Sequence, residues 1–398
     1  MSGSSDIRVI DLTHVIAGPF CTYQLAVMGA DVIKVEVPDR PDMVRAKTAE
    51  FPDGELGLAP NFIAQNANKR SIAIDLKSEQ GKAILLKMLR DADVLVENYR
   101  SGAMHQLGLG YDHIKDINPG IVYCSMTGFG QTGPKGGHTA YDNVIQAFSG
   151  LMASNGDDQT SPIKVGPPIL DYGTGIQAAF AIVCALYARK NTGMGQYIDI
   201  AMVDAAMMLM SSNITYFQQN NQLLPLTGNW SYSNAGYACY ETADGKLMIG
   251  AYTGVQYADM WAVLGDGDYG EQFRHQQPPG MKQTLTEDIE RIQTLLMENT
   301  AEYWEDQFNA HKVPAARVRT IDEALAEPQV NHRSVMQKPA QGDSGPYPTA
   351  AFSFKHDGPG LKRSPPRFAQ HSTEILEEFG FSGDEIENYV QSGAIRKE

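Results

Sequence analysis

The sequence has few cysteines and none of the common metal- or nucleotide-binding motifs. Its cysteines, Cys21, Cys124, Cys184 and Cys239, lie at least 55 residues apart, so no C-x-x-C pair predicts a zinc or redox site. Walker, G-x-G-x-x-G, H-E-x-x-H and G-x-S-x-G patterns are also absent. We therefore expect free thiols in a reducing cytosol, no metal site, and none of the enzyme classes that those motifs define.

Positive charge is also scarce. The 32 Lys and Arg residues stand against 47 Asp and Glu, a net charge of -15 that disfavours nucleic acid and anionic membranes as partners. Residues 1–100 carry a net charge of only -2, so a polyanionic ligand is favoured there. The N-terminal stretch has no basic segment followed by an apolar one, and the longest apolar run, Ala178–Ala188, predicts a buried helix too short to cross a bilayer. We expect a cytoplasmic protein without a membrane partner.

Strand-like and helix-like segments alternate in the first half of the chain. Residues 7–37 predict strand, helix, strand, and residues 71–98 repeat this order with Ser78 as a helix cap. Such alternation predicts a mainly parallel sheet. The 398 residues exceed the ~250–300 of one core, and the composition changes near residue 226. The predicted fold class is α/β, with a Rossmann-like large domain over 1–225, a small α+β domain over 226–330, and a segment 331–398 that returns to the large domain.

One acid occupies an unusual place. Asp171 lies where an extended segment meets a long apolar helix that ends at Gly193. There it is expected to face the free N–H groups of Gly173 to Gly175 and the positive end of the helix dipole, which favour its ionised form. A plain helix cap and two glycines that serve close packing are the alternatives left open by the sequence.

The order of several segments resembles the class III CoA-transferase family (CaiB/BaiF type), which includes formyl-CoA and carnitine CoA-transferases. The segments that carry the resemblance include IRVIDLTHVIAGPF, NANKRSIAIDLK, DVLVENYRSGAM, NPGIVYCSMTGFGQTGP, LDYGTGIQAAF and the tail HSTEILEEFGFSGDEI. The resemblance implies that Asp171 attacks an acyl-CoA and passes through an aspartyl anhydride and an aspartyl-CoA thioester. It also implies two interlocked chains, coenzyme A as a substrate, and no metal or permanently bound cofactor.

The resemblance further implies a set of CoA-binding positions. Asn98, Tyr99, Arg100 and Met104 match the CoA-binding loop, Ile74 and Leu76 the adenine slot, and Ile16 the turn beside the thiol arm. Arg40 and Lys77 are candidate phosphate contacts, although for each basic residue taken alone a solvated surface charge is the favoured interpretation. His14, Tyr141 and Gly173 match positions that line the active site.

Some positions depart from the family pattern. Formyl-CoA transferases have an arginine and a lysine where this chain has Gln106 and Thr139, and residues 229–237 replace their glycine loop. These departures disfavour formyl-CoA and oxalate as the natural pair. A racemase of the same family would need a histidine at Tyr141, and His138 lies three residues away, so α-proton exchange is the first alternative. A non-catalytic acyl-CoA-binding protein is the second.

Overall fold

The computed structural model describes residues 6–46, 57–342 and 345–398, and the chain forms two compact units. Unit 1 contains Met1–Leu151, Lys164–Thr215 and Arg333–Glu398, and unit 2 contains Met152–Ile163 and Tyr216–His332. Whether the chain folds as domains with boundaries at residues 226 and 330 stays a prediction. Residues 1–5 belong to the N-terminal stretch from which the cytoplasmic location was predicted, and they lie outside the described ranges.

Unit 1 is built on a seven-stranded sheet in the order β12-β3-β2-β1-β4-β5-β6. All neighbouring strands pair in parallel except β12, which runs antiparallel to β3, so the predicted mainly parallel sheet is confirmed. The strands are β1 (Arg8–Asp11), β2 (Asp31–Glu36), β3 (Arg70–Ile74), β4 (Val94–Glu97), β5 (Val122–Thr127), β6 (Gln196–Ala201) and β12 (Ile395–Arg396). The order of β1 to β6 is that of a doubly wound dinucleotide-binding fold.

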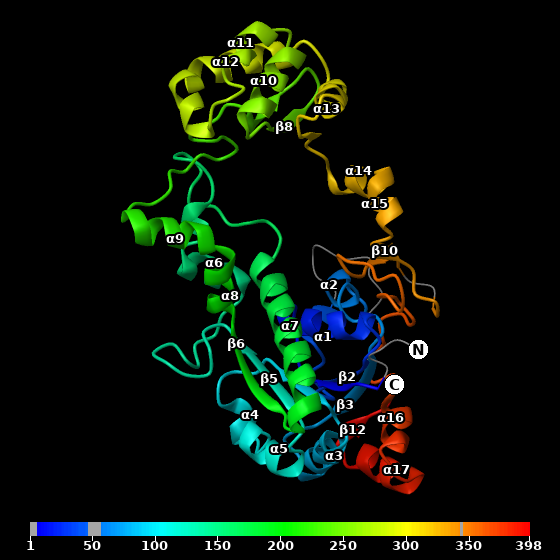
Figure 1. Ribbon diagram of the computed structural model, residues 1–398. Helices are drawn as coiled ribbons and strands as arrows, with labels where there is room; N and C mark the ends of the chain where they lie inside the picture. Colours follow the sequence, from blue (N-terminus) through cyan, green and yellow to red (C-terminus); the bar gives the residue numbers. More distant parts are fainter. Residues whose placement is uncertain (1–5, 47–56, 343–344) are drawn as a thin grey trace. The chain divides into compact units, whose positions relative to one another are not determined.

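Helices cover both faces of this sheet (Figure 1). Successive strand residues point to opposite faces, so Val9 packs with α1 and α7 while Ile10 packs with α3 and α5. The helices of unit 1 are α1 (Ala17–Val27), η1 (Met43–Arg45), α2 (Pro60–Ile63), α3 (Glu79–Arg90), α4 (Ala103–Gln106), α5 (Tyr111–Ile117), α6 (Asp142–Ser149), α7 (Ile169–Thr192), α8 (Met202–Leu209), α16 (Ser372–Glu378) and α17 (Gly383–Gln391). The short strands β10 (Met336–Gln337) and β11 (Tyr347–Pro348) pair with each other.

Several local predictions are confirmed. The first strand–helix–strand unit is present as β1, α1 and β2, and the Ser78 hydroxyl accepts a hydrogen bond from the N–H of Gly81 at 3.0 Å. Gly193, in the left-handed conformation with φ 70°, ends α7 as expected. Two helices, α8 and α9 (Ser211–Asn220), follow strand β6, which the sequence patterns did not predict.

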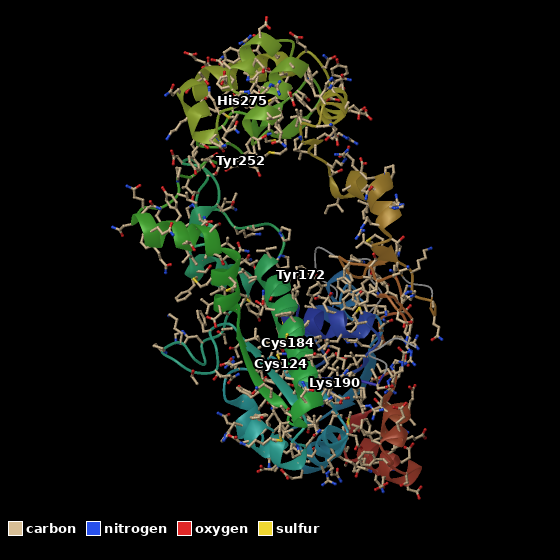
Figure 2. The ribbon with its side chains drawn as sticks, in the orientation of Figure 1. Cys124, Tyr172, Cys184, Lys190, Tyr252 and His275 are labelled. Atoms are coloured by element: carbon tan, nitrogen blue, oxygen red, sulfur yellow. The ribbon has the colours of Figure 1, made fainter. Side chains whose placement is uncertain are left out.

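Helix α7 differs from the buried helix that its apolar run predicted. It has 24 residues, and one side packs against α1 while the side chains of Ile176, Phe180, Val183 and Tyr187 are 53–72% exposed. Among the described residues, α7 is the one helix long and apolar enough to cross a membrane, a test that core helices of water-soluble proteins also pass. Figure 2 shows Tyr172, Cys184 and Lys190 in this order along α7.

Unit 2 combines a small antiparallel sheet with helices. Strands β7 and β8 form an antiparallel hairpin across residues 243–245. The elements are η2 (Met152–Ser154), β7 (Tyr237–Glu241), β8 (Lys246–Gly250), α10 (Gly254–Val263), α11 (Gly267–Glu271), η3 (Pro278–Thr284), α12 (Leu285–Leu296), α13 (Ala301–Ala310), β9 (Ala315–Arg317) and α14 (Ile321–Ala326), followed by α15 (Pro328–Arg333) at the return to unit 1. Buried Asp288 accepts hydrogen bonds at 2.6 Å from the hydroxyls of Tyr257, Tyr269 and Thr284 and so joins three segments of this core.

Candidate functional site

A cavity of about 760 Å³ opens in unit 1 at the carboxyl edge of the parallel sheet. Its walls are the loops that follow β1, β2, β4 and β5. Strands β1 and β4 are neighbours here, and the chain continues from them towards opposite edges of the sheet, as it does at the ligand-binding crevice of doubly wound folds. Six of the predicted site residues line this cavity: His14, Arg40, Asn98, Tyr99, Arg100 and Tyr141.

The other predicted residues lie outside the lining. Ile74, Leu76 and Met104 are buried in one core cluster with residues of α3 and α5. Ile74 belongs to β3, whose side chains are buried on both faces of the sheet, Leu76 follows this strand, and Met104 belongs to α4. Ile16 is the half-buried residue before α1, and the lining includes neither Gly173 nor Asp171. The adenine slot at Ile74 and Leu76 thus stays a prediction, and a ligand there would have to reach positions whose side chains are already packed.

The loops after β1 and β4 are joined by a reciprocal pair of hydrogen bonds. The N–H of His14 donates to Oδ1 of Asn98 at 2.9 Å, and Nδ2 of Asn98 donates to the carbonyl of His14 at 2.8 Å. The rings of His14 and Tyr99 meet edge to face, with centroids 5.8 Å apart. Burial lowers the pKa of His14, which favours its neutral form. The Asn98 amide therefore acts as a joint between two walls of the cavity.

Charged groups divide into a buried set and an exposed set around the cavity. The Glu36 carboxylate is held by Arg45 through two hydrogen bonds of 2.8 and 2.7 Å, so it cannot serve a ribose as a free acceptor. By contrast, within the described ranges the guanidinium groups of Arg40 and Arg100 make no ion pair or hydrogen bond with the chain, and both side chains are exposed. Two unpaired cations on the cavity wall can hold phosphate groups.

Asp171 is the third residue of α7, which begins two residues earlier than its predicted start. The expectation that free N–H groups would favour its ionised form is wrong. The buried Asp142 carboxylate takes the donors at this helix end, with Oδ2 2.7 Å from the N of Leu170 and 3.1 Å from the N of Asp171. Burial, assisted by the negative charge of Asp142, raises the pKa of Asp171 to about 7.

The Asp171 side chain has no hydrogen-bonding or cationic partner among the described residues. It does not cap the helix, because Pro168 is the capping residue and no side-chain cap is present. The two glycines that follow differ in what surrounds them. A Cβ at Gly175 would lie 2.8 Å from the carbonyl oxygen of Ala17, so Gly175 is required where α7 crosses α1, whereas a Cβ at Gly173 would meet only the Leu209 side chain at 3.0 Å.

Sequence reasoning missed two buried acids next to this site. Asp142, in the first turn of α6, follows Tyr141 on the cavity wall directly, so the cavity and the start of α7 are connected through α6. Glu97, at the end of β4, accepts hydrogen bonds from the Ser125 hydroxyl at 2.5 Å and from the N–H of Tyr99 at 2.8 Å, and burial raises its pKa to about 7. The sequence signal for both was an acid at the end of an apolar strand or the start of a helix.

Comparisons with known proteins agree with this architecture. The model of CoA-transferase family III matches residues 5–372. The chain is 34% identical over 383 residues to a succinate–glutarate CoA-transferase of Agrobacterium fabrum, covering 94% of this chain and 95% of the relative. It is 32% identical to a formyl-CoA:oxalate CoA-transferase of Streptomyces avermitilis, covering 98% of each. A CaiB/BaiF family protein from Brucella suis superposes with a TM-score of 0.82 at 30% identity, covering 94% of this chain and 98% of the other. This chain therefore belongs to CoA-transferase family III and is a CoA-transferase.

Proposed function

We propose that the enzyme moves coenzyme A from an acyl-CoA thioester to a free carboxylic acid, with Asp171 as the covalent nucleophile. The observation that carries this proposal is a half-buried carboxyl group with a pKa of about 7 and no partner within the described residues. Such a group is ionised in part at neutral pH, is more basic than an ordinary carboxylate, and is not held by a salt bridge that acylation would have to break.

The reaction proceeds through four acyl transfers. An oxygen of Asp171 attacks the thioester carbonyl, the carbon–sulfur bond breaks, and CoA leaves as a thiolate. The thiolate attacks the Asp171 carbonyl of the mixed anhydride and releases the donor acid, which leaves an aspartyl-CoA thioester. The acceptor carboxylate attacks this thioester to give a second anhydride and the thiolate again. The thiolate then attacks the acceptor carbonyl, forms the new thioester and restores the Asp171 carboxylate.

The cavity at the carboxyl edge of the sheet is the proposed CoA site. Arg40 and Arg100 supply cations for the phosphates, and they lie on the loops that follow β2 and β4. Tyr141 lies on the same wall and directly precedes Asp142, which is hydrogen bonded to the backbone N–H of Asp171. The thioester end of CoA would therefore approach the nucleophile past Tyr141. Because Tyr141 is 61% exposed, its ring is available to contact the acyl group.

For the acid pair we propose short dicarboxylates, because a relative of 34% identity is a succinate–glutarate CoA-transferase. The test is a panel of acyl-CoA donors and free acids in which new thioesters are followed by mass spectrometry. We expect exchange between succinyl-CoA and glutarate and weaker exchange with formyl-CoA and oxalate. Deuterium incorporation at the α-carbon without thioester exchange would instead identify a racemase, and binding of CoA esters without either reaction would identify a binding protein.

We further propose that the active enzyme is an interlocked homodimer in the cytoplasm, with α7 in the interface. The exposed side chains of Ile176, Phe180, Val183 and Tyr187 follow helical spacing and form one apolar stripe. A stripe of large exposed apolar side chains is typical of a surface that another chain covers.

The Phe180→Asp variant tests this interface. We expect it to be monomeric by analytical ultracentrifugation, because an aspartate in the stripe places an unpaired charge in the buried interface. The native thiol of Cys184, one helical turn further on, is exposed in a single chain and should react with a maleimide only in this variant. Phe354, 55% exposed in a coil, offers the matched control, and Phe354→Asp should stay dimeric. A monomeric wild-type enzyme would refute the interface.

A further inference from the structure

The start of α7 is fixed by one buried side chain of α6. Asp142 is 5% exposed, and its Oδ2 accepts hydrogen bonds from the N–H groups of Leu170 and Asp171. Its Oδ1 accepts from Nε2 of Gln146 at 2.5 Å, and Oε1 of Gln146 accepts from the N–H of Val165 at 2.9 Å, in the segment before α7. The whole carboxylate is thus occupied by the backbone around Asp171 and by the side chain that also holds this backbone.

This arrangement changes the electrostatics of the helix end. A helix N-terminus carries a partial positive charge that would stabilise a carboxylate in its first turn. Here the negative charge of Asp142 lies on those same N–H donors, so it offsets the dipole and adds like-charge repulsion towards Asp171. Burial and this repulsion act in the same direction on the pKa of Asp171, which is about 7.

Among the described residues, no ionisable group except Asp142 shifts the pKa of Asp171, although several elements pack around α7. Helix α1 and strand β5 contribute Cys21 and Cys124, buried thiols whose pKa is raised by burial. On α7 itself Tyr172 is adjacent, and burial followed by the charge of Asp171 raises its pKa. The acid of α8, Asp204, is exposed, and Asp199 of β6 accepts hydrogen bonds from the N–H of Gln131 instead. Asp142 is therefore the charged neighbour whose ionisation state matters to Asp171.

We propose that Asp142 is a positioning residue that also drives acylation: it fixes the start of α7 and, through like-charge repulsion, favours the acylated states of Asp171 over its free carboxylate. The inference rests on the proposed function of Asp171. Each covalent intermediate replaces the negative charge of Asp171 by a neutral acyl group, so the repulsion is present before acylation and absent after it. The free enzyme is therefore raised in energy relative to the anhydride and the aspartyl-CoA thioester. In this proposal Asp142 accepts no proton from Asp171.

The Asp142→Asn variant tests this inference. It keeps an oxygen that can accept the two backbone hydrogen bonds and removes the charge, together with the hydrogen bond that Oδ1 accepts from Gln146. The acid limb of kcat/KM against pH should have its midpoint near 7 in the wild type and about one pH unit lower in the variant, with about tenfold less acylated enzyme when donor acyl-CoA is added without acceptor. Acylated enzyme is measured by intact-protein mass spectrometry. Asp116→Asn, the same change at an exposed position of α5, should alter neither quantity.

The outcomes separate this inference from the proposed function. If wild-type Asp171 is never acylated, the proposed function fails. If Asp171 is acylated but a folded Asp142→Asn enzyme keeps the wild-type midpoint and the wild-type acylated fraction, the inference on Asp142 alone is refuted, even if kcat has fallen. Should the single variant not fold, Asp142→Asn with Gln146→Glu restores the donor and acceptor order with the charge moved away from α7. This double variant must also show the lower midpoint.

Discussion

Replacement of Asp171 by asparagine is expected to lower the rate of CoA transfer by about three orders of magnitude or more. The amide has the shape of the carboxyl group but cannot form the anhydride, and the remaining binding groups cannot supply a nucleophile. The measurement is steady-state exchange with the best acid pair of the panel, together with hydroxylamine trapping during turnover, which should convert the activated carboxyl of Asp171 to a hydroxamate in the wild type only.

The control for this prediction is Asp91→Asn, which removes one exposed carboxylate at the end of α3 and should keep the wild-type rate. Normal exchange by the Asp171→Asn enzyme, or hydroxamate at another residue, would contradict the assignment. The Asp171→Asn enzyme is expected to be more stable than the wild type, so a loss of activity would not come from unfolding.

The stability of the Asp171→Asn variant should exceed that of the wild type at alkaline pH. The folded protein binds the Asp171 proton more tightly than the unfolded chain does, because the pKa rises from its ordinary value of 3.8 to about 7. The carboxyl therefore favours the fold below about pH 4, and this contribution is lost as the pH rises through 7. The melting temperature of the variant minus that of the wild type should grow between pH 5 and pH 8.

The sheet was predictable because its strands are short apolar runs separated by clear turn signals. Ile7 to Glu36 contain two such runs, with an apolar helix and Gly29 between them, and local patterns suffice for this assignment. Strand β6 was missed since most of its residues are exposed or partly buried without a regular alternation, and it follows α7 after a turn of only three residues. Its pairing with β5 is a tertiary fact that no local signal carries.

The sequence predicted which residue occupies the site but not the charges and hydrogen bonds that surround it. The acid before an apolar helix identified Asp171, but the direction of its pKa shift was wrong because the donors at the helix start are taken by Asp142, 29 residues earlier. The same holds for Lys34 and Lys69. Lys34 lies between two apolar residues in the sequence and Lys69 between two polar ones, yet both are fully buried. Only the fold shows which acid accompanies each cation.

Replacement of Lys69 by methionine is expected to destabilise the fold by about 3–5 kcal/mol. The ammonium group lies 3.0 Å from Oδ2 of Asp11 and 2.9 Å from the carbonyl of Pro19, and both side chains of the pair are 0% exposed. Burial opposes ionisation of Asp11, but Lys69 and Lys34 outweigh it and hold its pKa below the ordinary value. Methionine fills a similar volume, so the cost comes from an uncompensated buried carboxylate directly beneath the loop that carries His14.

Urea unfolding at pH 7 measures this free energy, and two further variants interpret it. In Lys69→Met with Asp11→Asn the lone charge is removed as well, so much of the lost stability should return. The exposed pair of Lys115 and Asp112 provides the matched control, because an ion pair in water contributes little and Lys115→Met should cost far less than Lys69→Met. If Lys69→Met cost no more than Lys115→Met, the buried pair would not stabilise the fold. The folded fraction of the Lys69→Met enzyme should keep an exchange rate near that of the wild type, because Lys69 contacts no residue that is proposed to touch the substrates.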